Sequence, residues 1–240
     1  PVGPPSEPGF LLVSSVIGND ETGDGSFENP FATIGQAFNV MNNDDFIVVA
    51  PGVYQENLSV NNMSGLLVSI AGPDSTIIDG NGQGSVLEIA NGNWIVAGFT
   101  ITNGYGDNQG GGVRLWGGSI MMNQNRFVNN TALSYGGGLL AFNSDVMIDS
   151  TFFVGNNSDY IGGGLHIVND DSLSYRFVSI NNTVFAENTA NQGSGAGAYI
   201  GAFDGAYMDV YIERTGFIQN SGDNYTGLRI NGNIYANVCK

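Results

Sequence analysis

The chain has 240 residues, of which 22 are acidic and only 6 are basic, giving a formal net charge of −16. This charge excludes nucleic acid as a partner, because binding to a phosphate backbone requires a basic stripe that these residues cannot assemble. Hydrophobic residues make up 42% of the chain and charged residues 12%, so the sequence can bury a sizeable core and is not disordered in bulk.

The surface composition favours an extracellular or cell-surface location. The chain is rich in asparagine and has 37 glycines, whereas lysine occurs only at Lys240. Cys239 is the only cysteine, which excludes an internal disulfide. We find no apolar run of the ~18 residues that a membrane span needs and no signal-peptide pattern, so any export signal is expected outside this sequence.

The beginning of the chain predicts a flexible segment followed by an ordered domain. Residues 1–9 contain four of the seven prolines and show no periodic pattern, which is typical of a linker. The apolar run that starts at Phe10 predicts a first strand. We therefore expect a flexible segment over residues 1–9 and one domain over residues 10–240.

One short helix is predicted near the N-terminus. In the segment NPFATIGQAF, Asn29 or Pro30 can start a helix, and Phe31, Ile34 and Phe38 then lie on one face at spacings of three and four residues. No other segment predicts a helix as clearly. The runs that follow, such as FIVVA and LLVSIAG, are short, rich in β-branched residues and closed by glycine, asparagine or aspartate.

The rest of the chain repeats itself. Glycine triplets at Gly110–Gly112, Gly136–Gly138 and Gly162–Gly164 recur every 26 residues, and later repeats lengthen to 32 residues. Such a period predicts a solenoid, in which each unit buries its apolar face against its neighbours. Abundant glycine and β-branched residues exclude helical repeats, so we expect stacked parallel β-strands.

A second motif, Phe-x-x-Asn, predicts the corners of the coils. It occurs at Phe127–Asn130, Phe153–Asn156, Phe185–Asn188 and Phe217–Asn220. With ~4.8 Å between neighbouring strands, the phenylalanines should form an internal column, each worth ~1.5–3 kcal/mol of burial. We expect each asparagine to adopt left-handed backbone angles at the turn and to bond to the identical amide one coil away.

Aligned strands also predict two inward-facing columns, because side chains alternate between the faces of a strand. The two columns are Ile120, Val146, Val178 and Val210, and Met122, Ile148, Ile180 and Ile212.

These repeats resemble those of chlamydial-type polymorphic outer-membrane proteins, which carry F-x-x-N and G-G-A-[ILV] motifs, over residues ~99–230. The resemblance implies a right-handed parallel β-helix and a surface-exposed adhesive or structural role. Residues 18–58 are similar to the start of many secreted pectate-lyase-like β-helix proteins, which implies that the short helix caps the open end of the solenoid. The predicted fold class is therefore an all-β, right-handed parallel β-helix with a short N-terminal capping helix.

One outward column is the best candidate for a ligand-binding strip. The strands that follow the glycine triplets place the only histidine and two arginines in one row, which could face a carbohydrate or an acidic group. The alternative is that these are ordinary solvated positions. The candidate ligand-binding residues are Arg114, His166, Tyr199 and Arg229, with Leu140 in the same column and Glu88 at its start.

Calcium is the one cofactor that the sequence suggests, without establishing it. Insertions over residues 168–177 and 201–210 bring carboxylates toward the outward column, and a glycine-containing acidic loop precedes the predicted helix. Solvated loop carboxylates are the alternative. The candidate ligands are Asp170, Asp171, Asp204 and Asp209 in the insertions, and Asn19, Asp20, Asp24 and Glu28 in the acidic loop.

Asn-x-Ser/Thr sequences would be glycosylation candidates in a eukaryotic secreted protein. Several are expected by chance in a chain so rich in asparagine. They lie at Asn57, Asn62, Asn129, Asn156, Asn181 and Asn224.

The resemblance also indicates what an enzyme would need. Polysaccharide lyases of this fold use a Lys or Arg base beside Ca²⁺, and hydrolases use clustered Asp residues, but internal lysine is absent here. Asp149 and Glu213 share a column at two rungs' separation, about 10 Å, beyond the ~6.5–9.5 Å of inverting hydrolases.

We therefore expect a non-catalytic extracellular or cell-surface module with an adhesive or structural role, whose partner is a carbohydrate or a cell-surface protein. One alternative is a polysaccharide-active lyase or hydrolase of the pectate-lyase-like class. Another is a filament subunit that associates end to end, because an uncapped last coil would leave free strand edges.

Overall fold

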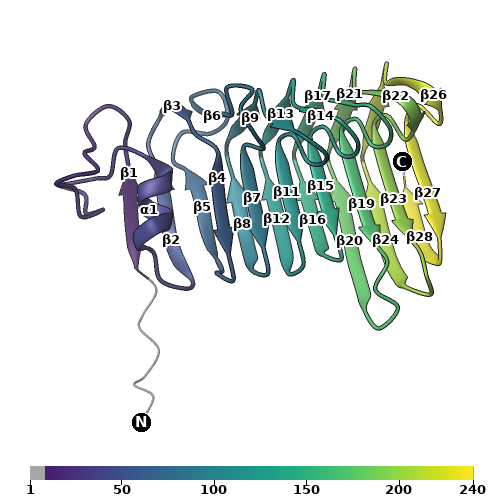
Figure 1. Ribbon diagram of the computed structural model, residues 1–240, viewed down its shortest axis with the longest axis horizontal. Helices are drawn as coiled ribbons and strands as arrows, with labels where there is room; N and C mark the ends of the chain where they lie inside the picture. Colours follow the sequence, from purple (N-terminus) through teal and green to yellow (C-terminus); the bar gives the residue numbers. More distant parts are fainter. Residues whose placement is uncertain (1–8, 240) are drawn as a thin grey trace, which may run out of the picture.

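The computed structural model describes residues 9–239 and is a right-handed parallel β-helix (Figure 1). This confirms the predicted fold class. Each complete coil gives one strand to each of three long sheets, A, B and C, and the later coils add a strand to a shorter sheet D. The segment predicted to be flexible, residues 1–9, lies outside the described residues except for Gly9. No helix in residues 9–239 has the length and hydropathy of a membrane span.

Sheets A and C form two neighbouring faces of the solenoid, and the chain passes from a strand of sheet C directly to a strand of sheet A. Sheet A contains, in spatial order, β1 (Phe10–Val13), β2 (Asp45–Val49), β5 (Gly65–Ser69), β8 (Asn93–Ala97), β12 (Ser119–Asn123), β16 (Asp145–Asp149), β20 (Tyr175–Asn181), β24 (Tyr207–Glu213) and β28 (Ile234–Cys239). Sheet C contains β4 (Leu58–Asn61), β7 (Leu87–Ala90), β11 (Val113–Trp116), β15 (Leu139–Phe142), β19 (Leu165–Asn169), β23 (Ala198–Ala202) and β27 (Leu228–Gly232).

Sheet B forms the third face, and sheet D lies in the loops that lead from sheet B back to sheet C. Sheet B contains β3 (Gly52–Gln55), β6 (Thr76–Asp79), β9 (Thr100–Thr102), β13 (Arg126–Val128), β17 (Phe152–Val154), β21 (Val184–Ala186) and β25 (Gly216–Ile218). Sheet D contains β10 (Tyr105–Gly106), β14 (Thr131–Ala132), β18 (Asn157–Ser158), β22 (Thr189–Ser194) and β26 (Ser221–Asn224).

The helix α1 (Ile34–Val40) begins later than the sequence predicts. Phe31 lies in a β-bridge with Val13, and Asp20 accepts hydrogen bonds from the backbone N–H groups of Ala32 and Thr33. These contacts hold the chain extended up to Thr33, whose Oγ1 then caps the helix by accepting from the N–H of Gln36 at 3.2 Å. Figure 1 shows α1 at the N-terminal end of the solenoid, beside β1 and β2.

The predicted inward columns form the core. The phenylalanine rings of the Phe-x-x-Asn motif stack face to face with centroid separations of 4.5, 4.7 and 5.1 Å along the column. The other two inward columns are buried and paired in register across β12, β16, β20 and β24. The prediction from period-two alternation is therefore confirmed.

The predicted asparagine ladder is also confirmed. The side-chain amide of Asn130 donates to Oδ1 of Asn156 at 3.0 Å, that of Asn156 to Asn188 at 3.0 Å, and that of Asn188 to Asn220 at 2.9 Å. The expected left-handed backbone was assigned to the wrong residue, because it belongs to the preceding position, as at Asn129 with φ of 55°. The ladder asparagine itself turns inward, where its amide serves buried backbone groups.

Candidate binding groove on the outer face of sheet A

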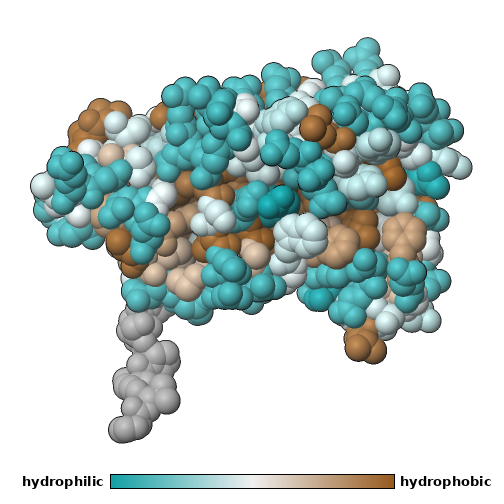
Figure 2. Space-filling view, viewed as in Figure 1, coloured by the Kyte–Doolittle hydropathy of each residue, from teal (hydrophilic) through white to brown (hydrophobic). Residues whose placement is uncertain are grey.

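The outer face of sheet A carries a continuous row of apolar side chains. Outward positions in register along this sheet are occupied by Phe10, Phe46, Leu66, Ile95, Met121 and Met147, one per strand from β1 to β16. The row runs along the solenoid axis and crosses every strand on its way. Figure 2 shows hydrophobic residues gathered in a band on this face, bordered by hydrophilic ones.

Two hollows follow this row. The first has a volume of about 420 Å³, and its floor is formed by Phe46, Leu66, Ile95, Met121 and Met147. The second, of about 220 Å³, shares Met121 and Met147 with the first and extends to residues of β20. We call the two together the sheet A groove. Its length is set by the stacking of coils rather than by any single loop.

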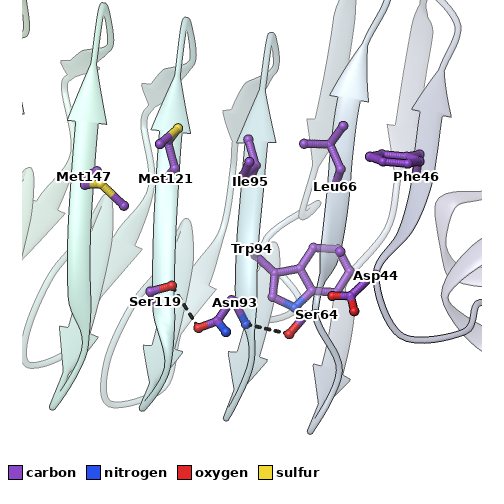
Figure 3. Close-up of a pocket in the computed structure, with 11 residues that line it drawn as sticks. Asp44, Phe46, Ser64, Leu66, Asn93, Trp94, Ile95, Ser119, Met121 and Met147 are labelled. Atoms are coloured by element: carbon purple, nitrogen blue, oxygen red, sulfur yellow. Dashed lines mark hydrogen bonds between the residues drawn. The ribbon is translucent and has the colours of Figure 1, made fainter. Parts of the chain in front are cut away.

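Small polar side chains line one edge of the groove. Ser119 Oγ donates to Asn93 Oδ1 at 2.9 Å, and the N–H of Asn93 donates to Ser64 Oγ at 3.1 Å, so the edge is connected across three successive coils (Figure 3). The carboxylates that line the hollows are Asp44 in the first and Asp149 in the second. An apolar floor with a polar edge suits the burial of a ligand's apolar face while its polar groups stay hydrogen-bonded.

Toward the C-terminus the same face becomes aromatic. Phe177 lines the second hollow, and its ring lies 5.6 Å from that of Tyr211 on the next strand. The carboxylate of Asp209, on the next strand of the same face, raises the pKa of Tyr175 to about 12. Asp209, predicted as a calcium ligand, thus acts on the ionisation of a tyrosine on the outer face of sheet A.

The predicted ligand-binding strip lies on another face, the outer side of sheet C. Its register is confirmed, because Glu88, Arg114, Leu140, His166, Tyr199 and Arg229 pair in that order along the sheet. The expectation that the strip faces solvent is wrong in its middle part. Leu140 is 2% exposed, His166 6% and Tyr199 4%.

Loops that carry sheet D cover this part of sheet C. The first glycine of each triplet lies against the column, and a Cβ on Gly162, which has φ of 68°, would stand 2.7 Å from Cβ of His166. Tyr135 and Tyr199 enclose the imidazole at centroid distances of 5.2 and 5.1 Å. Burial lowers the pKa of His166 to about 3, so the ring is neutral at ordinary pH. His166 is thus part of a second buried layer.

The two arginines of the strip lie at its ends. Arg114 forms an ion pair with Glu88 at 2.9 Å. Arg229 donates to Ser194 Oγ at 2.7 Å, and its guanidinium lies over the rings of Tyr199 and Tyr225 at 5.6 and 5.0 Å. The column therefore supplies two separate charged spots instead of one continuous strip.

The predicted calcium ligands are not gathered into a cluster. No group of three or more His, Cys, Asp or Glu side chains in residues 9–239 is arranged to hold a metal ion. Asp20 caps backbone amides before α1, Asp24 accepts from the N–H of Ser26, and Glu28 is exposed. In the insertions, Asn143 binds Asp170, and Asp171 accepts from the N–H of Leu173. Asp204 adopts φ of 53° at its turn.

The glycosylation candidates differ in accessibility. Asn156 is fully buried in the ladder, so a glycan there is incompatible with the fold. Asn181 is half-buried and donates to Ser179. The exposed candidates are Asn57, Asn62, Asn129 and Asn224, although the amide nitrogen of Asn57 is already bound to the carbonyl oxygens of Gly80 and Ser85.

The groove on sheet A was missed by the sequence analysis, although a signal for it exists. Its strands contain consecutive apolar residues, such as FIVV from Phe46, WIVA from Trp94 and IMM from Ile120, instead of a strict alternation. A continuous apolar run indicates a strand that is apolar on both faces. Several such runs in one aligned column would have predicted an apolar outer face.

The N-terminal part of the chain matches a known protein family. Residues 16–61 fit a family described as "Protein of unknown function (DUF1565)", a family of β-helix-like proteins. The matched segment begins in the loop after β1 and includes α1, β2, β3 and β4, the region that resembles the start of pectate-lyase-like β-helix proteins. No curated protein matches the chain. What the comparisons support is a β-helix module of that general kind.

Proposed function

We propose that this chain is a non-catalytic extracellular or cell-surface β-helix module that holds an elongated partner along the sheet A groove, in an adhesive or structural role. The observation that carries the proposal is the apolar row from Phe46 to Met147, which crosses five successive strands and is hollowed along its length. Exposed apolar hollows with polar edges are typical of interaction sites.

Charge defines the partner further. The ionisable side chains that line the groove are Asp44 and Asp149, and the chain as a whole carries a net charge of −16. An acidic partner would be repelled, whereas a neutral or basic one would be accepted. A neutral or amino-bearing polysaccharide and a basic cell-surface protein segment both meet this requirement.

The chemistry of the groove favours binding over turnover. The common mechanism of glycoside hydrolysis uses two carboxylates on either side of one bond, but Asp44 and Asp149 line different hollows. The polysaccharide-active enzyme remains an alternative predicted from the sequence. The end-to-end filament is a second such alternative.

The test uses Met121→Glu, which places a charge on the floor shared by both hollows, and Phe152→Glu as a matched control. Phe152 is 43% exposed on the outer face of sheet B, so both variants add one acid to a surface apolar position. The probes are immobilised neutral, amino-bearing and acidic polysaccharides and a basic and an acidic polypeptide, read by biolayer interferometry.

We expect a neutral or basic probe to bind the wild-type chain and the Phe152→Glu variant alike. A neutral probe should bind the Met121→Glu variant at least about tenfold more weakly, because a charge on the apolar floor must be desolvated. Preference for acidic probes, or equal binding by both variants, would overturn the proposal.

A further inference from the structure

A separate hollow lies on the outer face of sheet C, where the cover formed by sheet D begins. Strands β4 and β7 present small or short outward side chains there, including Ser59, Asn61 and Ala90. On the next strand, β11, the longer outward side chains of Arg114 and Trp116 line the opposite side of the hollow. The hollow between them has a volume of about 130 Å³.

Trp116 forms one wall of this hollow. It is 38% exposed, and its ring packs on Phe142 of the next strand at a centroid distance of 4.9 Å. The residue in register on the preceding strand is Ala90, so the indole meets no large side chain on that side. A rigid, half-exposed aromatic surface beside a small residue suits the apolar face of a flat ring.

Glu88 and Arg114 provide polar groups next to that wall. Their side chains are in register, are joined by an ion pair of 2.9 Å, and are about one-third exposed. A carboxylate accepts hydrogen bonds, and a guanidinium with five N–H donors retains several after pairing. Adjacent hydroxyl groups of a ligand could thus be bound by an acceptor and a donor at once, while the pair as a whole stays neutral.

We infer that Glu88, Arg114 and Trp116 form a subsite for one neutral hexopyranose ring. The ring would stack its C–H face on Trp116 and direct vicinal hydroxyls to Glu88 and Arg114. The volume admits a single ring rather than a chain. The net charge of −16 selects against acidic sugars. The subsite lies on a different sheet from the groove, so either proposal can fail without the other.

Tryptophan fluorescence reports on this subsite directly. The chain has two tryptophans, and Trp94 is 2% exposed with its Nε1 donating to the carbonyl oxygen of Met63 at 2.7 Å. Acrylamide should therefore quench Trp116 and spare Trp94. The probes are methyl β-D-galactopyranoside, methyl β-D-glucopyranoside and, as the acidic counterpart, methyl β-D-glucuronopyranoside.

We expect saturable, millimolar protection of Trp116 by at least one neutral glycoside. Glu88→Gln should weaken that protection about tenfold, since it removes a charged acceptor. The matched control is Glu213→Gln, which breaks a comparable surface pair with Arg214 at 3.3 Å and should leave the protection unchanged. Trp116→Ala should abolish the quenchable signal, with circular dichroism to verify the fold.

Three results would overturn the inference. They are no protection by either neutral glycoside at its solubility limit, equal protection in the Glu88→Gln variant, and protection by the glucuronide alone.

Discussion

The outer faces of sheets A and C are built from strands of the same coils, yet one is bare and the other is covered. In the coil that contains β15 and β16, Leu140 and Met147 are both aliphatic and both point away from the core. Leu140 is 2% exposed because a loop of sheet D lies over it, whereas Met147 lines the groove. An outward direction on a strand thus does not determine exposure, because neighbouring loops decide whether solvent reaches the side chain.

The largest expected effect comes from placing the same charge on both faces. Leu140→Asp buries an unpaired carboxylate and should lower the free energy of unfolding by about 5 kcal/mol. Met147→Asp leaves the carboxylate in contact with water and should cost about 1 kcal/mol. Denaturant unfolding of both variants measures the difference, and equal losses would mean that the loop cover is not a packed layer.

The asparagine ladder holds the loops of the cover in place, so its loss should be the next largest effect. Asn156→Ala leaves the N–H of Asn130 without its acceptor and the carbonyl oxygen of Phe127 without its donor. We expect a loss of about 4 kcal/mol, since each unpaired buried group costs roughly 1–3 kcal/mol. The control is Asn123→Ala, which removes a half-buried asparagine on sheet A. It should lower the free energy of unfolding by less than about 1 kcal/mol.

The covered histidine makes stability depend on pH. Burial lowers the pKa of His166 from 6.5 to about 3, so below pH 6.5 the unfolded chain binds a proton that the folded chain does not. Stability from this group is therefore present at neutral pH and is lost as the pH falls. Between about pH 7 and pH 4.5 the loss should be about 3 kcal/mol.

The His166→Leu variant isolates this contribution. The wild-type chain should lose about 3 kcal/mol more than the variant over the same pH range, measured by urea unfolding at each pH. Met147→Leu, on the bare face, should follow the wild-type pH dependence. A His166→Leu profile parallel to that of the wild type would show that the imidazole is open to solvent.

The smallest expected effect lies where the cover begins. Glu88→Gln breaks the ion pair with Arg114, but both side chains are about one-third exposed. The free energy of unfolding should change by less than about 1 kcal/mol. Thermal unfolding at low and at high salt measures this, and a loss of several kcal/mol would place the pair beneath the cover rather than at its edge.

Much of the fold could be predicted from the sequence because a solenoid repeats local rules. The phenylalanine column, the asparagine ladder and the register of the outward column follow from aligned periods, and each is confirmed. The start of α1 was misplaced because Asp20, distant in sequence, holds residues before Thr33 in an extended conformation. The exposure of the predicted strip could not be predicted for a similar reason, since loops bury His166, whereas Met121 on sheet A stays partly exposed and lines the groove.

The sequence by itself determined the β-helix, its core columns and its corners, because stacked coils place equivalent residues above one another. Tertiary structure alone decided which outward residues meet solvent. Strand alternation fixes the direction of a side chain, but exposure depends on how loops from sheet B pack back over sheet C. The groove on sheet A is open because no loop covers its strands. The hollow beside Trp116 lies where the loops begin to cover sheet C.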